Sequence, residues 1–352
     1  MRALVLAGGE GSRLRPLTHT NAKQLIPIAN TPILFHVLRG IADAGITEVG
    51  IVVGSTADEV RAAVGDGGAF GLRVTYIEQE APKGLAHAVL TAREFISGEP
   101  FVMYLGDNVV LEGIARFVAE FERHRPDAQI FLAAVREPER FGVVVLEGDR
   151  VVRLVEKPSE HVSDLALVGV YLFDDQILEA CEALTPSWRG ELEITEAIQW
   201  LVDHGRNVRA EMLTGWWKDT GRPEDLLEAN RMMLSVLEPR VEGEVDADST
   251  LEGVVVVEPG AKVVRSRIVG PTILGENALV EDSTVGPGVA LAAGCVVSAS
   301  VVEDSIVLEG SKIVGARGVV ASLLGRGVEV RRSGRGGAHR LIVGDHSQVE
   351  VD

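Results

Sequence analysis

A glycine-rich loop close to the start of the chain carries residue types that could bind phosphate. Residues 3–6 are apolar and typical of a short buried strand, and Gly8, Gly9 and Gly11 come soon after them. Glycine lets backbone N–H groups approach a phosphate closely, because no Cβ blocks the approach. A hydroxyl and several cations come next: Ser12, Arg13, Arg15 and Lys23. Because such cations can neutralise a polyphosphate, we interpret this stretch as a loop that holds a nucleoside triphosphate.

Two well-known glycine loops do not fit this stretch. A dinucleotide-binding loop needs a third glycine, and Leu14 stands at that position. A Walker loop needs a glycine followed by a lysine, and that dipeptide occurs nowhere in the sequence. An ordinary turn between a strand and a helix remains an alternative for the glycines taken alone. The cations therefore carry the interpretation as a phosphate loop.

Two aspartates follow apolar runs further along the chain. Asp107 comes just after residues 101–105, and Asp219 follows another apolar run. Two carboxylates at strand ends of one sheet, together with a triphosphate, form the ligand set that Mg²⁺ favours: few protein oxygens, several phosphate oxygens and waters. Taken separately, each aspartate could also be an ordinary loop or cap residue.

The elements that would position these residues alternate between strand and helix. A helix is predicted to begin at Thr31-Pro32, with proline in its first turn, and to end at Gly45. The next predicted elements are strands at 49–53, 74–77 and 101–105 and helices at 57–64 and 84–95. Such alternation indicates a Rossmann-like, doubly wound and mostly parallel sheet with helices on both faces, whose ligands bind at the carboxyl ends of strands.

Extended segments dominate from residue 142 to residue 173. The predicted strands here and beyond are 143–146, 151–155, 168–173 and 208–213, and the predicted helices are 175–184, 193–204 and one opened by Pro223. Lys157 follows the strand at 151–155, between Glu156 and Pro158. By itself this lysine is most simply a solvated surface charge.

The composition changes near Pro239, and no helical period follows from about 244 to 330. Apolar residues instead recur every six positions in three sets: Ile268, Leu274 and Val280; Val285, Leu291 and Val297; and Leu308, Val314 and Val320. A hexad with one inward aliphatic residue is typical of a parallel β-helix, and an irregular β-sandwich is the alternative. We therefore predict one domain over 1–240 and a hexapeptide-repeat β-helix domain over 241–352, in which the Arg- and Gly-rich stretch 331–337 is poorly packed.

The composition limits the kinds of partner that the protein can bind and indicates its cellular compartment. The net charge of −18 excludes nucleic-acid binding by a general basic field and favours local capture of an anionic small molecule. The two cysteines, Cys181 and Cys295, indicate a reducing compartment rather than a disulfide framework. No apolar run approaches the ~18 residues of a membrane span, and the apolar start is too short for a signal peptide. We expect a cytoplasmic protein with no nucleic-acid and no membrane partner.

Six ordered features resemble those of the sugar-phosphate nucleotidyltransferase family, over residues 1 to about 325. The first is the run from Leu6 to Lys23 that contains Gly8-Gly9-x-Gly11-Ser12-Arg13 and Pro16-Leu17-Thr18. The next four are Lys23-Gln24-Leu25-Ile26-Pro27-Ile28, Pro82-Lys83-Gly84-Leu85-Ala86-His87-Ala88, Arg189-Gly190-Glu191-Leu192-Glu193-Ile194-Thr195 and Gly215-Trp216-Trp217-Lys218-Asp219-Thr220-Gly221. These resemble the glucose-1-phosphate thymidylyltransferase branch. The hexads are similar to the left-handed parallel β-helix of its long form, which is found with deoxysugar and antibiotic-sugar pathways.

The resemblance implies that the domain over 1–240 converts dTTP and glucose 1-phosphate into dTDP-glucose and pyrophosphate with Mg²⁺. The implied nucleotide-binding residues are Leu6, Gly8, Gly9, Gly11, Ser12, Arg13, Gln79, Gly84 and Asp107, of which Gln79 and Gly84 would read the thymine edge. The implied sugar-phosphate-binding residues are Gly142, Glu156, Lys157 and Val168, the catalytic cations are Arg13, Lys23 and Lys157, and the metal ligands are Asp107 and Asp219. Phe141 stands where many relatives have tyrosine, so a hydroxyl contact from that position is lost.

Three alternatives remain open on the sequence. A non-catalytic regulatory relative is disfavoured, because the whole charged set is retained: Arg13, Lys23, Asp107, Lys157 and Asp219. A second, acyltransferase activity of the β-helix would need a base, and the only histidines beyond residue 204 are His339 and His346, outside the hexads. A uridylyl-, guanylyl- or adenylyltransferase with the same machinery is the nearest alternative, because base choice depends on a few hydrogen bonds. We also expect a homo-oligomer.

Overall fold

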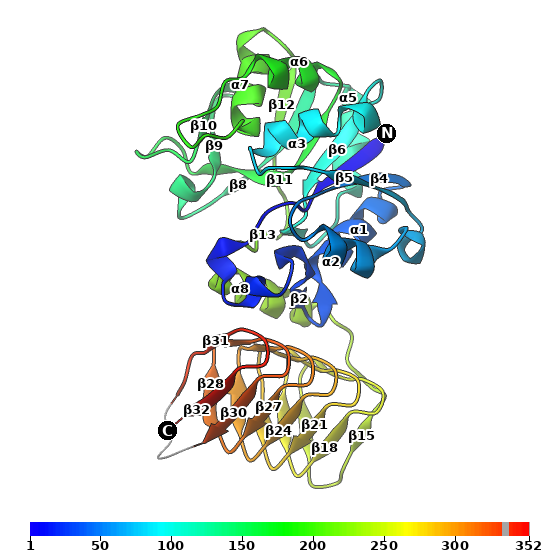
Figure 1. Ribbon diagram of the computed structural model, residues 1–352, viewed down its shortest axis with the longest axis vertical. Helices are drawn as coiled ribbons and strands as arrows, with labels where there is room; N and C mark the ends of the chain where they lie inside the picture. Colours follow the sequence, from blue (N-terminus) through cyan, green and yellow to red (C-terminus); the bar gives the residue numbers. More distant parts are fainter. Residues whose placement is uncertain (333–337, 352) are drawn as a thin grey trace. The chain divides into compact units, whose positions relative to one another are not determined.

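The computed structural model describes residues 1–332 and 338–351, and these residues divide into two units (Figure 1). Unit 1 consists of Met1–Glu10 and Ile33–Asp219, and unit 2 of Gly11–Pro32 and Thr220–Asp352. Residues 333–337, most of the stretch predicted to be poorly packed, lie outside the described residues, as does Asp352. The predicted domain boundary near residue 240 stays a prediction.

A nine-stranded sheet forms the centre of unit 1. Its strands are β1 (Arg2–Leu6), β4 (Glu48–Val53), β5 (Arg73–Glu78), β6 (Phe101–Leu105), β8 (Ala128–Ala134), β9 (Gly142–Glu147), β10 (Arg150–Glu156), β11 (Leu165–Phe173) and β12 (Val208–Met212). They lie in the order β5-β4-β1-β6-β11-β8-β12-β10-β9. The first four are parallel, as predicted, and β12 is parallel to β8. Strand β11 runs antiparallel to β6 and β8, so the whole sheet is mixed.

Helices cover both faces of this sheet, as predicted. They are α1 (Ile33–Asp43), α2 (Ala57–Val64), α3 (Leu85–Thr91), α4 (Arg93–Ile96), α5 (Ala115–His124), α6 (Gln176–Ala183) and α7 (Ile194–Asp203). Helices α3, α4, α6 and α7 share one apolar core with alternate sheet residues such as Ile130 and Leu132. Phe131, between those two, stacks instead on Phe117 of α5, which places α5 on the opposite face. Among the described residues, no helix is long and apolar enough to cross a membrane.

Some elements of unit 1 differ from the sequence predictions. The predicted helix 84–95 is broken at Ala92, which separates α3 from α4. The segment 108–141 had no predicted element, yet it contains α5, β8 and the short strand β7 (Asn108–Val110), which pairs with β13 (Trp217–Asp219). Strand β8 is an almost unbroken apolar run, as expected where both faces of a sheet are covered.

Unit 2 contains a parallel β-helix built of three sheets (Figure 1). The first sheet consists of β14 (Arg240–Val241), β17 (Val255–Val257), β20 (Thr272–Leu274), β23 (Val289–Leu291), β26 (Ile306–Val307), β29 (Leu323–Leu324) and β31 (Ile342–Val343). The second consists of β15 (Glu244–Val245), β18 (Lys262–Val264), β21 (Leu279–Glu281), β24 (Val296–Ser298), β27 (Lys312–Val314), β30 (Glu329–Arg332) and β32 (Gln348–Val351). The third consists of β16 (Thr250–Glu252), β19 (Arg267–Val269), β22 (Thr284–Val285), β25 (Val301–Glu303) and β28 (Arg317–Val320). All pairings within the three sheets are parallel.

The apolar hexads fill the interior of the β-helix, with one correction. The first two predicted sets, which begin at Ile268 and at Val285, are completely buried. The third set was wrong by one residue: Ile313 is buried, whereas Val314 is 41% exposed. The reason is a shorter coil. Successive strands pair 17 residues apart at Lys262↔Leu279 and Leu279↔Val296, and then 16 apart at Val296↔Lys312.

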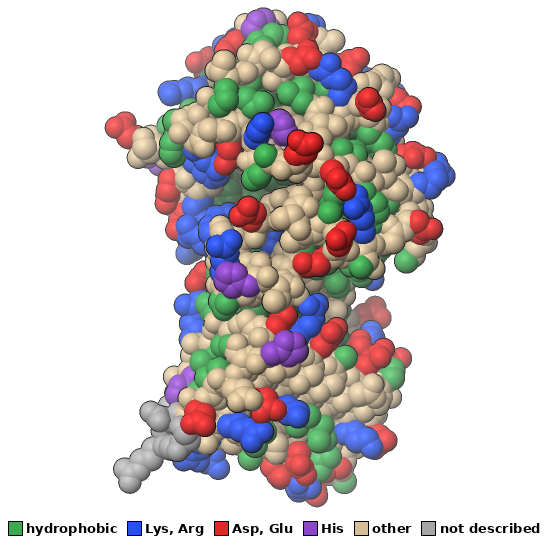
Figure 2. Space-filling view, viewed as in Figure 1, with side chains coloured by type: hydrophobic (Ala, Val, Ile, Leu, Met, Phe, Trp, Pro, Cys, Tyr) green, Lys and Arg blue, Asp and Glu red, His purple; other side chains and the backbone are tan. Residues whose placement is uncertain are grey.

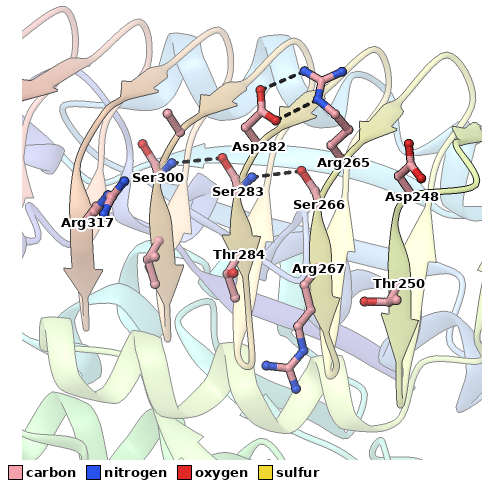
Figure 3. Close-up of a pocket in the computed structure, with 12 residues that line it drawn as sticks. Asp248, Thr250, Arg265, Ser266, Arg267, Asp282, Ser283, Thr284, Ser300 and Arg317 are labelled. Atoms are coloured by element: carbon pink, nitrogen blue, oxygen red, sulfur yellow. Dashed lines mark hydrogen bonds and ion pairs between the residues drawn. The ribbon is translucent and has the colours of Figure 1, made fainter.

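A ladder of serines runs along one corner of the β-helix (Figure 3). Ser283 N donates to Ser266 Oγ at 3.0 Å, and Ser300 N donates to Ser283 Oγ at 3.1 Å. Each hydroxyl donates in turn to the carbonyl two residues before it. Because these serines are buried, the ladder satisfies polar groups that would otherwise be costly at a turn.

Helix α8 (Pro223–Ser235), which begins at the predicted proline, and the segment 11–32 pack on the first sheet of the β-helix. The segment holds η1 (Ser12–Leu14), η2 (Leu17–His19), η3 (Lys23–Leu25), β2 (Pro27–Ile28) and β3 (Thr31–Pro32). Asn230 of α8 is fully buried; it accepts from Ala29 N at 2.8 Å and donates to Gly288 O at 3.1 Å. Thr31 pairs with Ile28 in a small hairpin, and α1 begins one residue after Pro32.

Charged residues are mixed over the surface. On the face drawn in Figure 2, Lys and Arg side chains are interspersed with Asp and Glu side chains. Many of them form ion pairs, such as Arg73–Glu48 in unit 1 and Arg267–Glu252 in unit 2.

The corrected hexad register predicts that Ile313→Ala will lower the free energy of unfolding by about 2–5 kcal/mol, because it leaves a cavity in the interior column. Its neighbour Lys312 is exposed and serves as the matched control, for which Lys312→Ala should change stability by at most ~0.5 kcal/mol. Chemical denaturation followed by circular dichroism measures both. Equal, small effects of the two substitutions would contradict the corrected register.

Candidate functional site

A pocket of about 410 Å³ lies at the carboxyl ends of three parallel strands of unit 1. Strands β1, β4 and β5 end at Leu6, Val53 and Glu78, and the pocket is lined by the residues that follow them. The lining residues are Gly8, Glu10, Val53, Gly54, Ser55, Ala57, Asp58, Arg61, Glu78, Gln79, Glu80 and Pro82. Ligands of open α/β sheets bind at this edge. The predicted nucleotide residues Gly8 and Gln79 therefore stand in one cavity.

Two backbone segments come very close together at the floor of this pocket. A Cβ at Gly54 would lie 2.8 Å from Gly8 O, so only glycine fits there without a backbone shift. Ala7 N donates to Val52 O at 2.8 Å, and Leu6 O accepts from Gly106 N at 2.9 Å. The carbonyl of Leu6 is thus bonded within the sheet, whereas Gly9 is exposed.

Gln79 is held by two neighbours on the α3 side of the pocket. Its Nε2 donates to His87 Nδ1 at 2.9 Å, in the tautomer with the proton on Nε2 of the imidazole, and lies 3.4 Å from Gly84 O. Gly84 itself packs against the backbone of Leu192. Burial, and secondly the positive charge of Lys83, lower the pKa of His87 from its usual value near 6.5. His87 is therefore neutral at pH 7 and can accept this hydrogen bond.

The two predicted metal ligands come together through the pairing of β7 with β13. Asp219 pairs in register with Asn108, the residue that follows Asp107. Asn108 Nδ2 donates to Asp107 Oδ1 at 3.1 Å, and Asn108 Oδ1 accepts from Trp217 Nε1 at 2.7 Å. Asp107 is 9% exposed. Asn108 and Trp217, to which the sequence analysis gave no role, thus fix the backbone that carries both carboxylates.

Three of the predicted sugar-phosphate residues, Gly142, Glu156 and Lys157, lie on β9 and at the end of β10, beside Thr195 of α7. Lys157 Nζ lies 3.4 Å from Glu156 Oε1, and Thr195 Oγ1 donates to Glu156 Oε2 at 2.7 Å. A Cβ at Gly142 would lie 2.7 Å from Thr195 Oγ1 and 3.0 Å from Glu156 Oε2, so the bare backbone there leaves room for both side chains. Lys157 has a φ of 41°, a left-handed conformation uncommon for residues other than glycine and often found at functional sites.

Val168 and Phe141 have mainly packing roles in this region. The side chain of Val168 is completely buried, so only its backbone could face a ligand. Phe141, without a hydroxyl, places its ring 5.6 Å from the ring of Trp217 in a tilted arrangement. The aromatic contact gives Phe141 a packing role beside β13.

Arg189 and Glu193 extend the charged network around Glu156. Arg189 Nη1 lies 3.6 Å from Glu156 Oε1 and 3.1 Å from Glu193 Oε1. Burial, and then the charge of Glu156, raise the pKa of Glu193. Burial also raises the pKa of Tyr171, with further contributions from Glu156 and Asp219. Because both carboxylates act on one buried tyrosine, the sugar-phosphate residues and the predicted metal ligands form one continuous region.

The remaining predicted residues, Gly11, Ser12, Arg13 and Lys23, belong to unit 2. The Cβ of Lys23 lies 2.9 Å from the position of a Cβ at Gly11, whose φ is 63°. Thr18 Oγ1 donates to Gly11 O at 2.8 Å. The stem of Lys23 therefore packs on the glycine turn, while Ser12 and Arg13 are exposed.

Several pocket residues were missed by the sequence analysis. Gly54 and Ser55 follow an apolar strand, just as Gly8 follows β1, and this repeated pattern of a glycine after a strand could have identified them. No such pattern marks Asp58 and Arg61 as pocket residues, because they lie on helix α2 rather than directly after a strand. Arg61 donates to Glu78 Oε1 at 2.7 Å, and the resulting ion pair lies at the rim of the pocket.

A second groove, of about 560 Å³, runs along the serine corner of the β-helix (Figure 3). Arg265 donates to both Asp282 and Glu281, and Arg267 donates twice to Glu252. Their guanidinium groups are thus committed to neighbouring coils. Among the described residues, no group of three or more His, Cys, Asp and Glu is arranged to hold a metal ion, in either groove or elsewhere.

The chain is similar to known proteins in sequence over its full length and in fold over its N-terminal part. The family model for nucleotidyl transferases matches residues 2–236. A glucose-1-phosphate thymidylyltransferase of Streptomyces griseus is 55% identical over 100% of this chain and 99% of its own length, and one of Streptomyces antibioticus is 53% identical over the same shares. A crystal structure from Bacillus anthracis, described as a candidate glucose-1-phosphate thymidylyltransferase in complex with sucrose, has a TM-score of 0.64 and 33% identity. That match covers 68% of this chain and 98% of the other.

The contact between His87 and Gln79 predicts a pH-dependent pocket. Since the folded-state pKa of His87 lies below its unfolded value, the neutral form and its hydrogen bond persist above pH ~6.5, and they are lost as the pH falls through the lowered pKa. An NMR titration of the His87 ring should give a pKa below 6.5, and Lys83→Ala should raise it. A pKa at or above 6.5 in the unmodified protein would contradict the assignment.

Proposed function

Because the chain belongs to the nucleotidyl transferase family, we propose that it transfers the deoxythymidylyl group of dTTP to glucose 1-phosphate, giving dTDP-glucose and pyrophosphate. The observation that carries this proposal is the 55% and 53% identity, over the full chain, to two named glucose-1-phosphate thymidylyltransferases. The pocket at the ends of β1, β4 and β5 supports it, because Gly8 and Gln79, two of the proposed nucleotide ligands, line the same cavity.

The proposed nucleotide site combines backbone and side-chain donors. Gly8, Gly9, Gly11 and Ser12 would bind the triphosphate through their N–H groups and hydroxyl, because no bulky side chain stands in the way. Arg13 would neutralise charge on the α-phosphate and on the departing pyrophosphate. Gln79 would read the base edge, with His87 as the acceptor that orients its amide. Leu6 and Gly84 contribute the adjoining backbone.

The acidic pair Asp107 and Asp219 suits a hard divalent cation. Mg²⁺ commonly takes one or two protein carboxylates and completes its shell with phosphate oxygens and water. Asp219 at the end of β13 and Asp107, the residue before β7, fit this preference. When bound, the cation would offset phosphate charge and act as a Lewis acid at the α-phosphate. Magnesium as the particular metal is part of the proposal.

The sugar phosphate would be bound by Lys157 in the region of Glu156 and Gly142. Glu156 holds Lys157 by an ion pair and keeps an oxygen bonded to Thr195, so the carboxylate is already oriented to accept from a sugar hydroxyl. Val168 would contribute its backbone only, since its side chain is fully buried. Lys23 would bridge phosphates of the two substrates.

The proposed transfer depends on aligning the two substrates rather than on moving a proton. An oxygen of the glucose 1-phosphate attacks the α-phosphorus, a new P–O bond forms, and the bond to the bridging oxygen of pyrophosphate breaks with its electron pair. The attacking oxygen is already anionic, so no general base is required. The protein must hold two mutually repelling anions in line, for which Arg13, Lys23 and Lys157 supply the positive charge.

Three further points stay predictions. A substrate variant that uses UTP or another nucleoside triphosphate is the alternative to dTTP, whereas a non-catalytic relative is disfavoured by the retained charged set. The cytoplasmic compartment and the homo-oligomeric state are predictions from the sequence. The β-helix is proposed to serve assembly or regulation, because no histidine lies within its hexads.

The proposal predicts pyrophosphate release when the protein is supplied with Mg²⁺, glucose 1-phosphate and dTTP. We expect a kcat/KM for dTTP that exceeds that for UTP by about 10–200-fold, because one methyl group separates thymine from uracil. A coupled assay with each nucleoside triphosphate in turn measures this. No release with any triphosphate would refute the enzymatic function, and a preference for GTP would refute the branch.

The acidic pair predicts that Asp107→Asn and Asp219→Asn each lower kcat by about 10²-fold or more, since each removes charge from the proposed metal ligands. Circular dichroism should find the fold unchanged. Asp164→Asn is the matched control, because the carboxylate of this exposed aspartate pairs with His161 in a loop and was given no role in the site, so kcat should be unchanged. Near-normal turnover of either ligand variant would contradict the metal assignment.

A further inference from the structure

The segment 11–32 is fastened to the far end of the β-helix by side chains of the last two coils. Asp345 Oδ2 accepts from Thr20 Oγ1 at 2.9 Å and from Asn21 Nδ2 at 3.1 Å. Gly344, next to Asp345, lies against Pro16, whose carbonyl oxygen is 3.2 Å from the position of a glycine Cβ. All these residues belong to unit 2.

Arg326 closes the network from the preceding coil. Its guanidinium donates to Asn21 Oδ1, and its backbone N–H donates to Asp345 Oδ1 at 2.7 Å. Arg326 Nε also lies 3.6 Å from Glu309 Oε2. Asn21 is only 7% exposed and donates in addition to Leu17 O at 3.1 Å. Both atoms of its amide are therefore satisfied, one by each of the two anchoring side chains.

The anchored residue stands two positions before Lys23. Because the stem of Lys23 packs on Gly11, and Thr18 bonds the carbonyl of Gly11, the glycine turn, the anchor and the lysine form one folded unit. Ser12 and Arg13 are exposed, whereas Leu14 and Leu17, between the glycine turn and the anchor, are buried. The position at which Asn21 is held therefore contributes to the conformation of the loop that carries Arg13 and Lys23.

We propose that Asp345 and Arg326 are positioning residues for the nucleotidyl transfer: through Thr20 and Asn21 they hold the phosphate loop in its binding conformation. The inference rests on the proposed function, because it takes Arg13 and Lys23 to bind the triphosphate. The family model ends at residue 236, so Thr20 and Asn21 lie within the matched region and their anchors lie beyond it. The last coils of the β-helix thus become part of the nucleotide-binding machinery.

Release of the anchor has a definite kinetic signature. If the loop is in its binding conformation only a tenth of the time, the apparent affinity for dTTP falls about tenfold, because binding must select that minor population. Saturating dTTP restores the conformation, so kcat changes little. General unfolding would instead lower the amount of active enzyme, and hence kcat, at an unchanged KM.

The test compares Asp345→Ala with a matched control in the full-length chain. Asp304→Ala removes a carboxylate from another corner of the β-helix, where it pairs with Arg231 of α8 rather than with Thr20 or Asn21. Hydrogen exchange measured by mass spectrometry should become faster in peptides that cover 11–26 in Asp345→Ala. Asp304→Ala should leave those peptides as they are. Asp345→Asn, which keeps one acceptor oxygen, should give an intermediate rate.

Steady-state kinetics supply the second readout. Asp345→Ala should raise the KM for dTTP by about tenfold with kcat within about twofold, Asp345→Asn should restore part of the difference, and Asp304→Ala should match the unmodified enzyme. Unchanged exchange in 11–26 would overturn the anchoring, and faster exchange with unchanged KM would overturn its role in the reaction. A loss of kcat alone would mean that Asp345 serves stability only. If the unmodified protein transfers no thymidylyl group, the proposed function fails first, and the exchange arm still reports on the anchor.

Discussion

Repulsion between two anions is the constraint that governs this protein. A nucleoside triphosphate and a sugar phosphate must meet on a chain whose net charge is −18. The few cations that serve them must therefore be fixed locally rather than supplied by a basic surface. Lys157, the proposed ligand of the sugar phosphate, forms an ion pair with Glu156, and Arg189 in turn compensates Glu156 and the buried Glu193. Glu156 thus orients Lys157, and the negative charge of Glu156 is balanced by both Lys157 and Arg189.

The strands of unit 1 provide that local fixation because their carboxyl ends converge. At the ends of β1 and β4 the chain approaches so closely that Gly54 leaves no room for a side chain beside Gly8. The pocket at these strand ends is bounded by the sheet and by glycine backbone. Its polar groups are already held in place, so they need little reorganisation when an anion binds. Asn108 fixes the local structure around the acidic pair. Its side chain donates a hydrogen bond to Asp107 and accepts one from Trp217, which lies on the same strand as Asp219.

Local sequence patterns predicted what local physics decides. The helix 57–64 and the strand 101–105 have the predicted bounds, because strong apolar periodicity and flanking turns define them. The pattern failed where tertiary packing prevails. Strand β8 carries no alternation, since both of its faces are covered, and the shortened coil before Lys312 moved the inward position by one residue. For the candidate site, the family resemblance implied roles for Gln79 and Glu156. It placed His87 and Arg189 in motifs without a role, because their contacts with Gln79 and Glu156 depend on side-chain geometry.

The two units are defined by contacts between residues far apart in the sequence, which local sequence patterns cannot predict. Asn21 and Asp345 are 324 residues apart in sequence, yet one carboxylate links them. Closing a loop of this length costs little more conformational entropy than closing a shorter one. The contact adds to the apolar cluster in which Ala29 and Leu234 pack on the first β-helix sheet. Buried apolar residues such as Leu14 and Leu17 fix part of the segment that carries the glycine turn. Its polar residue Asn21 is held instead by the last coils of the β-helix. These contacts are the physical basis for the proposal that the last coils of the β-helix help to position the phosphate loop.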